Sequence, residues 1–266
     1  MLGFGLGLRG GSGASPGPAA IFGATSYSDL MFADMGRLWQ DSAAASPVTA
    51  QGQPVGLVSG LGSAGGQALQ ATASQRPTWQ GSHAEFDGVD DYLDLNAAAR
   101  DITRNASGLT LWTVFRPASV AFMALIGVST TGATTPRVLL QVLSTGALRL
   151  SYRREDGDGS TVVDSAAGVV GAGLDHAVVL TLDFAGGGSE ALRVWLNGMP
   201  VISATISGTG NTSDTAAARG RVGGSLSGAP PTPLTSGRIY RCGLARRACS
   251  AAEAQLLTTS LQGGIA

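Results

Sequence analysis

The fold class of this 266-residue chain is decided by the stretch Leu109-Thr110-Leu111-Trp112-Thr113-Val114-Phe115, which alternates in polarity and is closed by Pro117. Successive side chains of a β-strand point to opposite faces, so the alternation predicts a strand with one face in a core. Further stretches of this kind follow at roughly ten-residue spacing: 122–128, 137–143, 148–153, 162–164, 176–183, 192–196, 200–206, 220–224 and 236–244. Many short strands with almost no helix predict an all-β, jelly-roll β-sandwich.

The two ends of the predicted sandwich differ from its body. Ser250-Ala-Ala-Glu253 is a capping box that predicts a short C-terminal helix. Residues 28–32 read as an N-cap and a short helical turn. Residues 39–79 are small, polar and turn-rich, which predicts irregular structure wrapped on the core.

A glycine-rich N-terminal arm precedes this body. Its apolar residues alternate with glycine and share one face of an extended strand: Leu2, Phe4, Leu6 and Leu8. A glycine-rich strand is weak alone and fits best when docked on another chain, while a disordered terminus is the alternative. We therefore expect an attachment arm over residues 1–28 and a folded domain over residues 29–266.

Composition excludes several classes of function. The chain has 17 basic and 18 acidic side chains, so its net charge of −1 disfavours a generic nucleic-acid binder. No apolar run approaches the roughly 20 residues that cross a bilayer, so we expect no membrane span. The N-terminus is a poor signal peptide, which predicts synthesis in the cytoplasm. Cys242 and Cys249 are too few for a disulfide framework.

The acidic stretch around residues 85–91 leaves three interpretations open. On a strand, Glu85 and Asp87 would lie about 7 Å apart on one face, and paired carboxylates at such separations hydrolyse glycosides. Asp87, Asp90 and Asp91 are weak candidates for Ca²⁺ ligands, so we expect no metal or cofactor beyond a possible Ca²⁺. The third interpretation is a β-turn, because Asp-Gly favours tight turns.

Arginine and tryptophan placement indicates a sugar-binding surface. In the strand 192–196 and the turn after it, Arg193, Trp195 and Asn197 point away from the aliphatic face. Arg149 and Arg153 occupy the corresponding positions around the strand 148–153. Sugars bind by stacking on aromatic rings while polar side chains hold their hydroxyl groups, and arginine adds attraction for acidic sugars. We expect one sheet to present these five residues outward, and packing of Trp195 under a loop is the alternative.

Several stretches in combination resemble the concanavalin A-like, laminin-G-type jelly-roll domains of bacterial surface proteins and phage structural proteins. The resemblance spans about residues 30 to 260 and is carried by these segments: 76–78, 86–93, 109–116, 192–198, 237–244 and 250–253. Many members of this group bind Ca²⁺ through acidic loops, and one branch hydrolyses glucans with a Glu-x-Asp-x-x-Glu motif. Asp90 stands where the last Glu of that motif should be, which argues against hydrolysis.

Residues 38–56 resemble the version of this domain found in phage appendages. Together with the arm, the resemblance implies a spike or fibre of a virion or phage-like particle, such as the head-spike fibre of a gene transfer agent. We therefore expect a non-enzymatic adhesin on the particle surface that binds cell-surface or capsular polysaccharide. Its other expected partners are virion proteins such as a spike base or capsid, and further copies of itself. The alternatives are a glycan depolymerase using Glu85 and Asp87, and a purely structural decoration protein.

Overall fold

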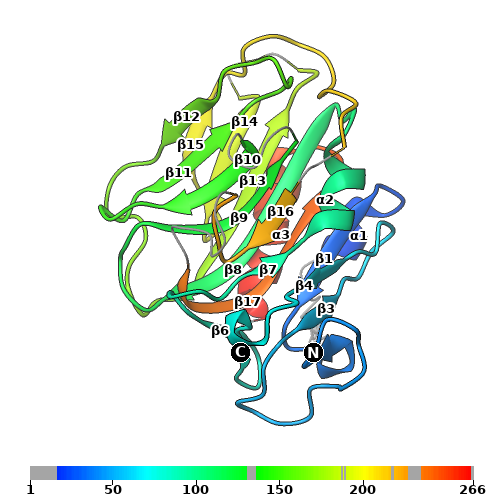
Figure 1. Cartoon of the computed structure of the whole chain (residues 1–266). Coiled ribbons are helices and arrows are strands. Elements are labelled where there is room, and N and C mark those ends of the chain that lie inside the picture. The colour runs from blue at the N-terminus through cyan, green and yellow to red at the C-terminus, as the bar shows by residue number, and fades with distance from the viewer. Residues whose placement is uncertain are drawn as a thin grey trace, which may run out of the picture.

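The computed structural model describes residues 17–130, 136–186, 188, 190–216, 219–226 and 235–264; the side chains of residues 96–98 are outside this description. The apolar positions of the expected arm, Leu2 to Leu8, also lie outside the described residues. Over the described residues the chain forms two antiparallel sheets packed face to face (Figure 1). The expected all-β sandwich is confirmed.

Sheet A contains the long strands of the sequence-predicted core. Its members are β1 (Tyr27–Met31), β5 (Thr78–Trp79), β6 (Ala84–Asp87), β8 (Gly108–Pro117), β13 (His176–Asp183), β14 (Leu192–Leu196), β15 (Met199–Ala204) and β17 (Ser236–Ala245). They are ordered β15-β14-β13-β8-β17-β6-β5, and β1 pairs with β17. The alternating stretch 109–115, which forms most of β8, therefore lies at the centre of this sheet.

Sheet B forms the other layer. Its strands are β2 (Leu38–Trp39), β3 (Leu57–Ser59), β4 (Gln67–Leu69), β7 (Leu93–Asp94), β9 (Met123–Ser129), β10 (Pro136–Val142), β11 (Leu148–Tyr152), β12 (Thr161–Asp164) and β16 (Arg219–Val222). Their order is β12-β11-β10-β9-β16-β7-β4-β3-β2. Three of these strands, β2 to β4, fall where the sequence predicted irregular structure.

The core lies between the sheets and follows the period-2 pattern. Leu111 and Phe115 of β8 and Leu140 and Leu150 of sheet B are all 0% exposed and belong to one apolar cluster. Cys242 of β17 lies in the same cluster as a free thiol. Because alternate residues of each strand enter this core, their neighbours form the outer faces of the sheets.

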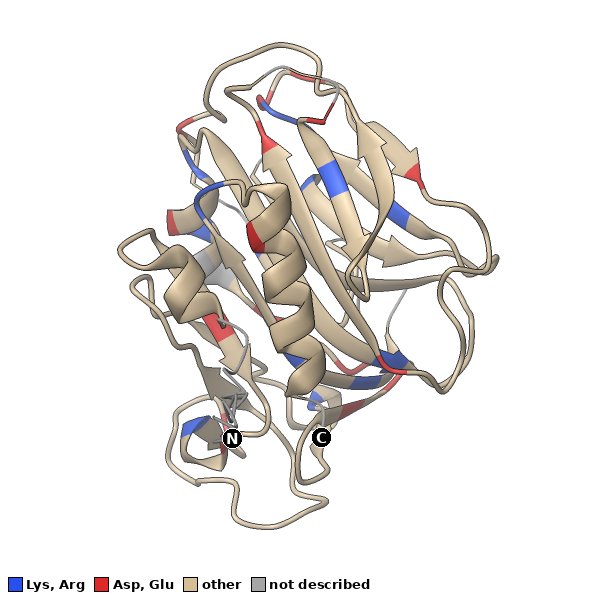
Figure 2. Cartoon of the chain, turned by 180° about the vertical axis from the view of Figure 1, so that it is seen from behind, with Lys and Arg blue, Asp and Glu red and all other residues tan. Residues whose placement is uncertain are grey.

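Three helices and two 3-10 turns complete the described chain: α1 (Pro18–Phe22), α2 (Asn96–Thr103), α3 (Ala251–Gly263), η1 (Met35–Arg37) and η2 (Ala73–Gln75). The predicted capping box is present at the start of α3, where the Ser250 and Glu253 side chains each accept from the other's backbone N–H. Figure 2 shows α3 lying along the outer face of sheet A. No helix in the described part of the chain is long and apolar enough to cross a membrane.

A second apolar cluster forms between α3 and sheet A. Ala254, Leu257 and Leu261 of α3 pack there with Trp112 and Trp195, and Phe22 of α1 stacks on Trp112 with ring centroids 5.2 Å apart. The outer face of sheet A is thus partly a second core.

Residues 17–28 belong to the folded body, so two expectations about this region are wrong. The stretch 28–32 forms β1 and not a helical turn, because it pairs antiparallel with β17, from Tyr27 opposite Ala245 to Met31 opposite Arg241. The folded domain also starts before Asp29, since α1 and Tyr27 are packed in the second cluster. Long-range pairing overrides the local helical signal here.

Candidate functional site

The structure divides the five predicted sugar-binding residues between two surfaces. Arg193 and Trp195 lie on β14 of sheet A, whereas Arg149 lies on β11 of sheet B. The expectation that one sheet presents all five is therefore wrong. Alternation along a strand tells which residues share a face, but it does not tell to which sheet the strand belongs.

On sheet B the predicted arginines are held in ion pairs and hydrogen bonds. Arg149 donates two hydrogen bonds to Asp164, of 2.8 and 2.7 Å, at the exposed surface. Arg153 is only 4% exposed, and its Nη2 donates to Thr130 Oγ1 at 3.0 Å. Arg137, which was not predicted from the sequence, is 0% exposed and donates to Asp156 Oδ1 at 3.0 Å.

Asp156 and the buried arginines link three loops of the protein. Its carboxylate accepts from Arg137 and lies 3.7 Å from the Arg153 guanidinium, while Arg137 also donates to the carbonyl oxygens of Thr103 and Ser213. These bonds join the loops around residues 103, 156 and 213. Removal of one partner from such a buried pair would leave an uncompensated charge, and most donors of these guanidinium groups are already engaged within the protein.

On sheet A the outer face carries a groove beside α3, made of two adjoining hollows. The first has a volume of about 540 Å³ and is lined by Thr181, Asp183, Gly186, Gly188, Glu190, Ala191, Arg193, Ala248, Cys249, Ser250 and Ala251. The second, of about 560 Å³, is lined by Glu190, Arg193, Trp195, Gly198, Met199, Pro200, Ser203, Ala251, Ala252 and Gln255. Three shared residues make the hollows contiguous, and together we call them the α3 groove.

Arg193 and Trp195 meet in this groove. Both belong to the outward set of β14, and the Arg193 guanidinium lies 5.9 Å from the Trp195 ring centroid. Trp195 is only 4% exposed because α3 packs on it, so the indole lies in the groove wall and is not an open stacking platform. Arg193 forms an ion pair with Glu190 three residues before it.

Asn197 shapes the hairpin that borders the second hollow. Asn197 has a positive φ of 52° in the turn between β14 and β15. The pair Asn197-Gly198 suits such a turn, because both residues tolerate a positive φ. The Asn197 Oδ1 accepts from the backbone N–H of Ala177 at 2.8 Å. Asn197 therefore anchors the hairpin to β13.

Three residues that α3 and the hairpin bring together were not predicted from the sequence. Met199 is 67% exposed at the hairpin, and it lines the second hollow together with Ser203 of the same strand and Gln255 of α3. Ser203 lies within the predicted strand 200–206 and Met199 directly precedes it, but Gln255 follows from the packing of α3 alone. A local pattern carries no signal for such a meeting.

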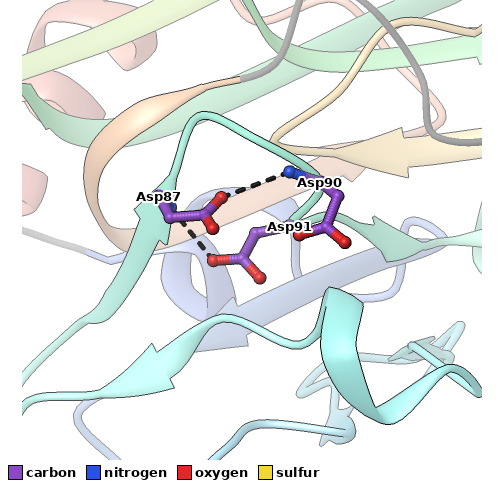
Figure 3. Close-up of side chains that lie close together, drawn as sticks. All are labelled: Asp87, Asp90 and Asp91. Carbon is purple, nitrogen blue, oxygen red and sulfur yellow. Dashed lines mark hydrogen bonds between the residues drawn. The ribbon is translucent and has the colours of Figure 1, made fainter.

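The predicted carboxylate pair is engaged in other contacts. Glu85 lies 3.2 Å from Arg238 Nε and 3.3 Å from His83 Nε2. Asp87 Oδ1 accepts from the backbone N–H groups of Val89 and Asp90 at 2.8 and 3.3 Å. The acidic stretch thus forms the β-turn that was the third interpretation (Figure 3).

Asp87, Asp90 and Asp91 form an acidic cluster at this turn, with ligand atoms all within 4.8 Å of one another. Asp91 Oδ2 accepts from the Asp87 N–H at 3.0 Å, so backbone donors already use oxygens on both carboxylates (Figure 3). Ca²⁺ takes about six to eight oxygen ligands. The three carboxylates carry six oxygens, of which two already accept backbone hydrogen bonds, so they fall short of a full set. The cluster does not fit a Ca²⁺ site by itself.

The Asp91 carboxyl predicts a measurable pH dependence. Burial raises its pKa to about 6, and the charges of Asp87 and Asp90 act in the same direction. The folded state then holds a proton that the unfolded state loses near pH 4, so this group's contribution to stability falls as pH rises from about 4 to 6. Asp91→Asn removes this pH-dependent contribution. Between pH 4 and pH 6 the unfolding free energy of wild type should therefore fall by roughly 2 kcal/mol relative to that of the variant.

Urea denaturation at half-unit pH steps from 4 to 7 measures this difference. Asp90→Asn is the control, because it changes the same cluster without removing the buried carboxyl. A difference between Asp91→Asn and wild type that stays constant from pH 4 to 7 would contradict the prediction.

Comparison with known proteins supports the fold. Neither a protein-family model nor a curated protein matches the chain in sequence. Among solved structures, the chain is similar to the CBM40 of the IT-sialidase of Ruminococcus gnavus bound to α2,3-sialyllactose, with a TM-score of 0.55 and 18% identity over 66% of this chain and 96% of that one. It is also similar to a K499G mutant of the NanB sialidase of Streptococcus pneumoniae (TM-score 0.53, 15% identity, 64% and 27% covered).

The sialidase of Trypanosoma rangeli is a third structural neighbour, with a TM-score of 0.54 and 15% identity over 82% of this chain and 34% of that enzyme. At these identities the likeness concerns the fold. The chain thus has the β-sandwich fold of the Ruminococcus gnavus CBM40.

Proposed function

We propose that this protein is a non-enzymatic glycan-binding module and that the α3 groove holds the glycan. The observation that carries the proposal is the pair of contiguous hollows of about 540 and 560 Å³ meeting at Arg193. Concave sites with an apolar wall and a few polar groups suit small ligands. The likeness to a carbohydrate-binding module seen with sialyllactose adds support from the fold.

The finer role we propose is that of a spike or fibre on a virion or phage-like particle, such as a gene transfer agent. The resemblance of residues 38–56 to phage appendage domains supports it, and residues 1–16 would supply the attachment. Several copies on one particle would multiply a weak single-site affinity for cell-surface polysaccharide into firm adsorption.

Arg193→Ala tests the groove, and Arg149→Ala is its matched control on the other sheet. Arg193 lines both hollows, so its loss should weaken binding to the glycan that the wild type binds best on an array by about tenfold or more. Arg149 pairs with Asp164 on sheet B, so its loss should leave affinity within about twofold. Calorimetric titration gives both values. Equal loss in the two variants would remove the groove as the site.

Particle adsorption to cells with and without capsular polysaccharide tests the finer role, with released sugar assayed in the supernatant. Capsule-dependent adsorption that disappears with this protein supports the adhesin. Release of sugar would instead favour a depolymerase. Unchanged adsorption together with poorly assembled particles would favour structural decoration.

A further inference from the structure

The charges that line the α3 groove bear on which glycan it accepts. Three charged side chains line it within the described residues: Asp183, Glu190 and Arg193. Arg193 is already paired with Glu190, and Asp183 Oδ1 accepts from the backbone N–H groups of Ala185 and Gly186 at 3.0 Å each. Acidic groups thus outnumber basic groups, which disfavours a sugar that carries a carboxylate or sulfate.

The helix N-terminus beside the first hollow does not reverse this preference. Glu253 Oε2 accepts from the Ser250 N–H at 2.9 Å, so a carboxylate already lies at the first turn of α3. That carboxylate uses one of the donors at this end of the helix. Arg247 donates to it at 2.7 and 2.9 Å and balances its charge, so this corner adds no net positive charge from its side chains.

The shape of the α3 groove indicates how many sugar units it can hold. The two hollows share Glu190, Arg193 and Ala251, so a chain of sugars can pass from one to the other along α3. Each hollow has its own polar lining residues, Thr181 and Asp183 in the first, and Ser203 and Gln255 in the second. A single terminal sugar would use only one of these sets.

We infer that the α3 groove takes an internal segment of a neutral, linear glycan, with sugar units in both hollows and the Glu190–Arg193 pair at the crossing. This inference rests on the proposed function and narrows its ligand class. It separates this chain from its structural neighbour, which was seen with an acidic trisaccharide.

Titration of the full chain with defined oligosaccharides tests charge and length together. The neutral probes are malto-, cello- and chito-oligosaccharides of two to six units, and the acidic probes are α2,3-sialyllactose and a sialic acid hexamer. We expect at least one neutral hexamer to bind ten times more tightly than its dimer and than either acidic probe. Equal affinity of dimer and hexamer, or tighter binding of an acidic probe, would overturn the inference and leave glycan binding intact. No binding to any probe would overturn the proposed function as well.

Two blocking variants localise the bound segment. Gly188→Trp fills the first hollow, where a Cβ added at Gly188 meets only the Gly186 carbonyl oxygen at 3.9 Å. Ser203→Trp fills the second from an exposed position on β15. Gly157→Trp is the matched control, on an exposed loop where an added Cβ meets nothing within 4 Å.

Each blocking variant should weaken hexamer binding about tenfold, and the control should stay within twofold, with thermal unfolding showing that all three are folded. A hexamer that binds normally to one of the two blocking variants occupies only the other hollow, and that result would overturn the inference.

Discussion

A chain shortened to begin at Asp29 is expected to lose most of its stability, whereas a chain that begins at Gly17 is expected to keep it. The first truncation removes α1 and Tyr27, and with them the cover over Trp112. Phe22 and Tyr27 are 3% and 7% exposed, and deletion of one large buried aromatic side chain costs about 3–5 kcal/mol. Two such losses consume most of a typical domain's stability of about 5–15 kcal/mol.

The truncation also removes polar contacts that hold α1 in place. Arg247 Nη2 donates to the Ile21 carbonyl oxygen at 2.6 Å, and its guanidinium lies 5.2 Å from the Phe22 ring centroid. Circular dichroism and guanidinium denaturation of the two shortened chains compare them directly with the full chain. Matching midpoints for all three would show that residues 17–28 contribute nothing to the fold.

Asp29→Ala is the point substitution with the largest expected cost, about 3–5 kcal/mol. The Asp29 carboxylate is 2% exposed and accepts from Trp112 Nε1 at 3.1 Å and from Arg241 Nε at 2.8 Å. Removal of the carboxylate leaves a guanidinium and an indole N–H without their acceptor under α1 and α3. Buried donors that lose a partner account for most of such costs.

Two further variants distinguish the cost of an unpaired buried charge from the cost of simply shortening a side chain. Asp34→Ala breaks an exposed pair with Arg37, whose side chains are 43% and 37% exposed, and should cost at most about 1 kcal/mol. The double variant Asp29→Ala/Arg241→Ala should cost less than the sum of its two single variants, because no guanidinium is then left without a carboxylate. Strict additivity in urea denaturation would contradict this account.

The sequence predicted best the longer strands whose alternating apolar side chains pack into the core. β13 and β14 were expected at 176–183 and 192–196 and are found there, because alternating apolar residues leave no other register that fills a core. Short strands such as β3 and β4 have too few residues to show the alternation of apolar and polar side chains that identifies a strand. The stretch that forms β1 was misread because its partner β17 lies more than 200 residues later.

The groove could be predicted only in part. Arg193 and Trp195 share the outer face of β14, as their spacing indicated, and both line the groove. The sequence could not show that α3 would bury the indole and supply Gln255 to the opposite wall. It also could not separate β11 from β14, because strands of both sheets show the same alternation.

The position of α3 has a consequence for rearranging the chain. A Cβ added at Gly17 would lie 3.7 Å from Ser260 Oγ, one turn before the end of the helix. The first and last described segments are therefore neighbours, and a short linker from Gly264 to Gly17 spans little distance. Circular permutation is commonly tolerated where ends adjoin. New ends opened at Gly159, an exposed position outside the Glu155–Asp158 turn, would then place any fusion partner at the loops of sheet B, away from α1 and α3.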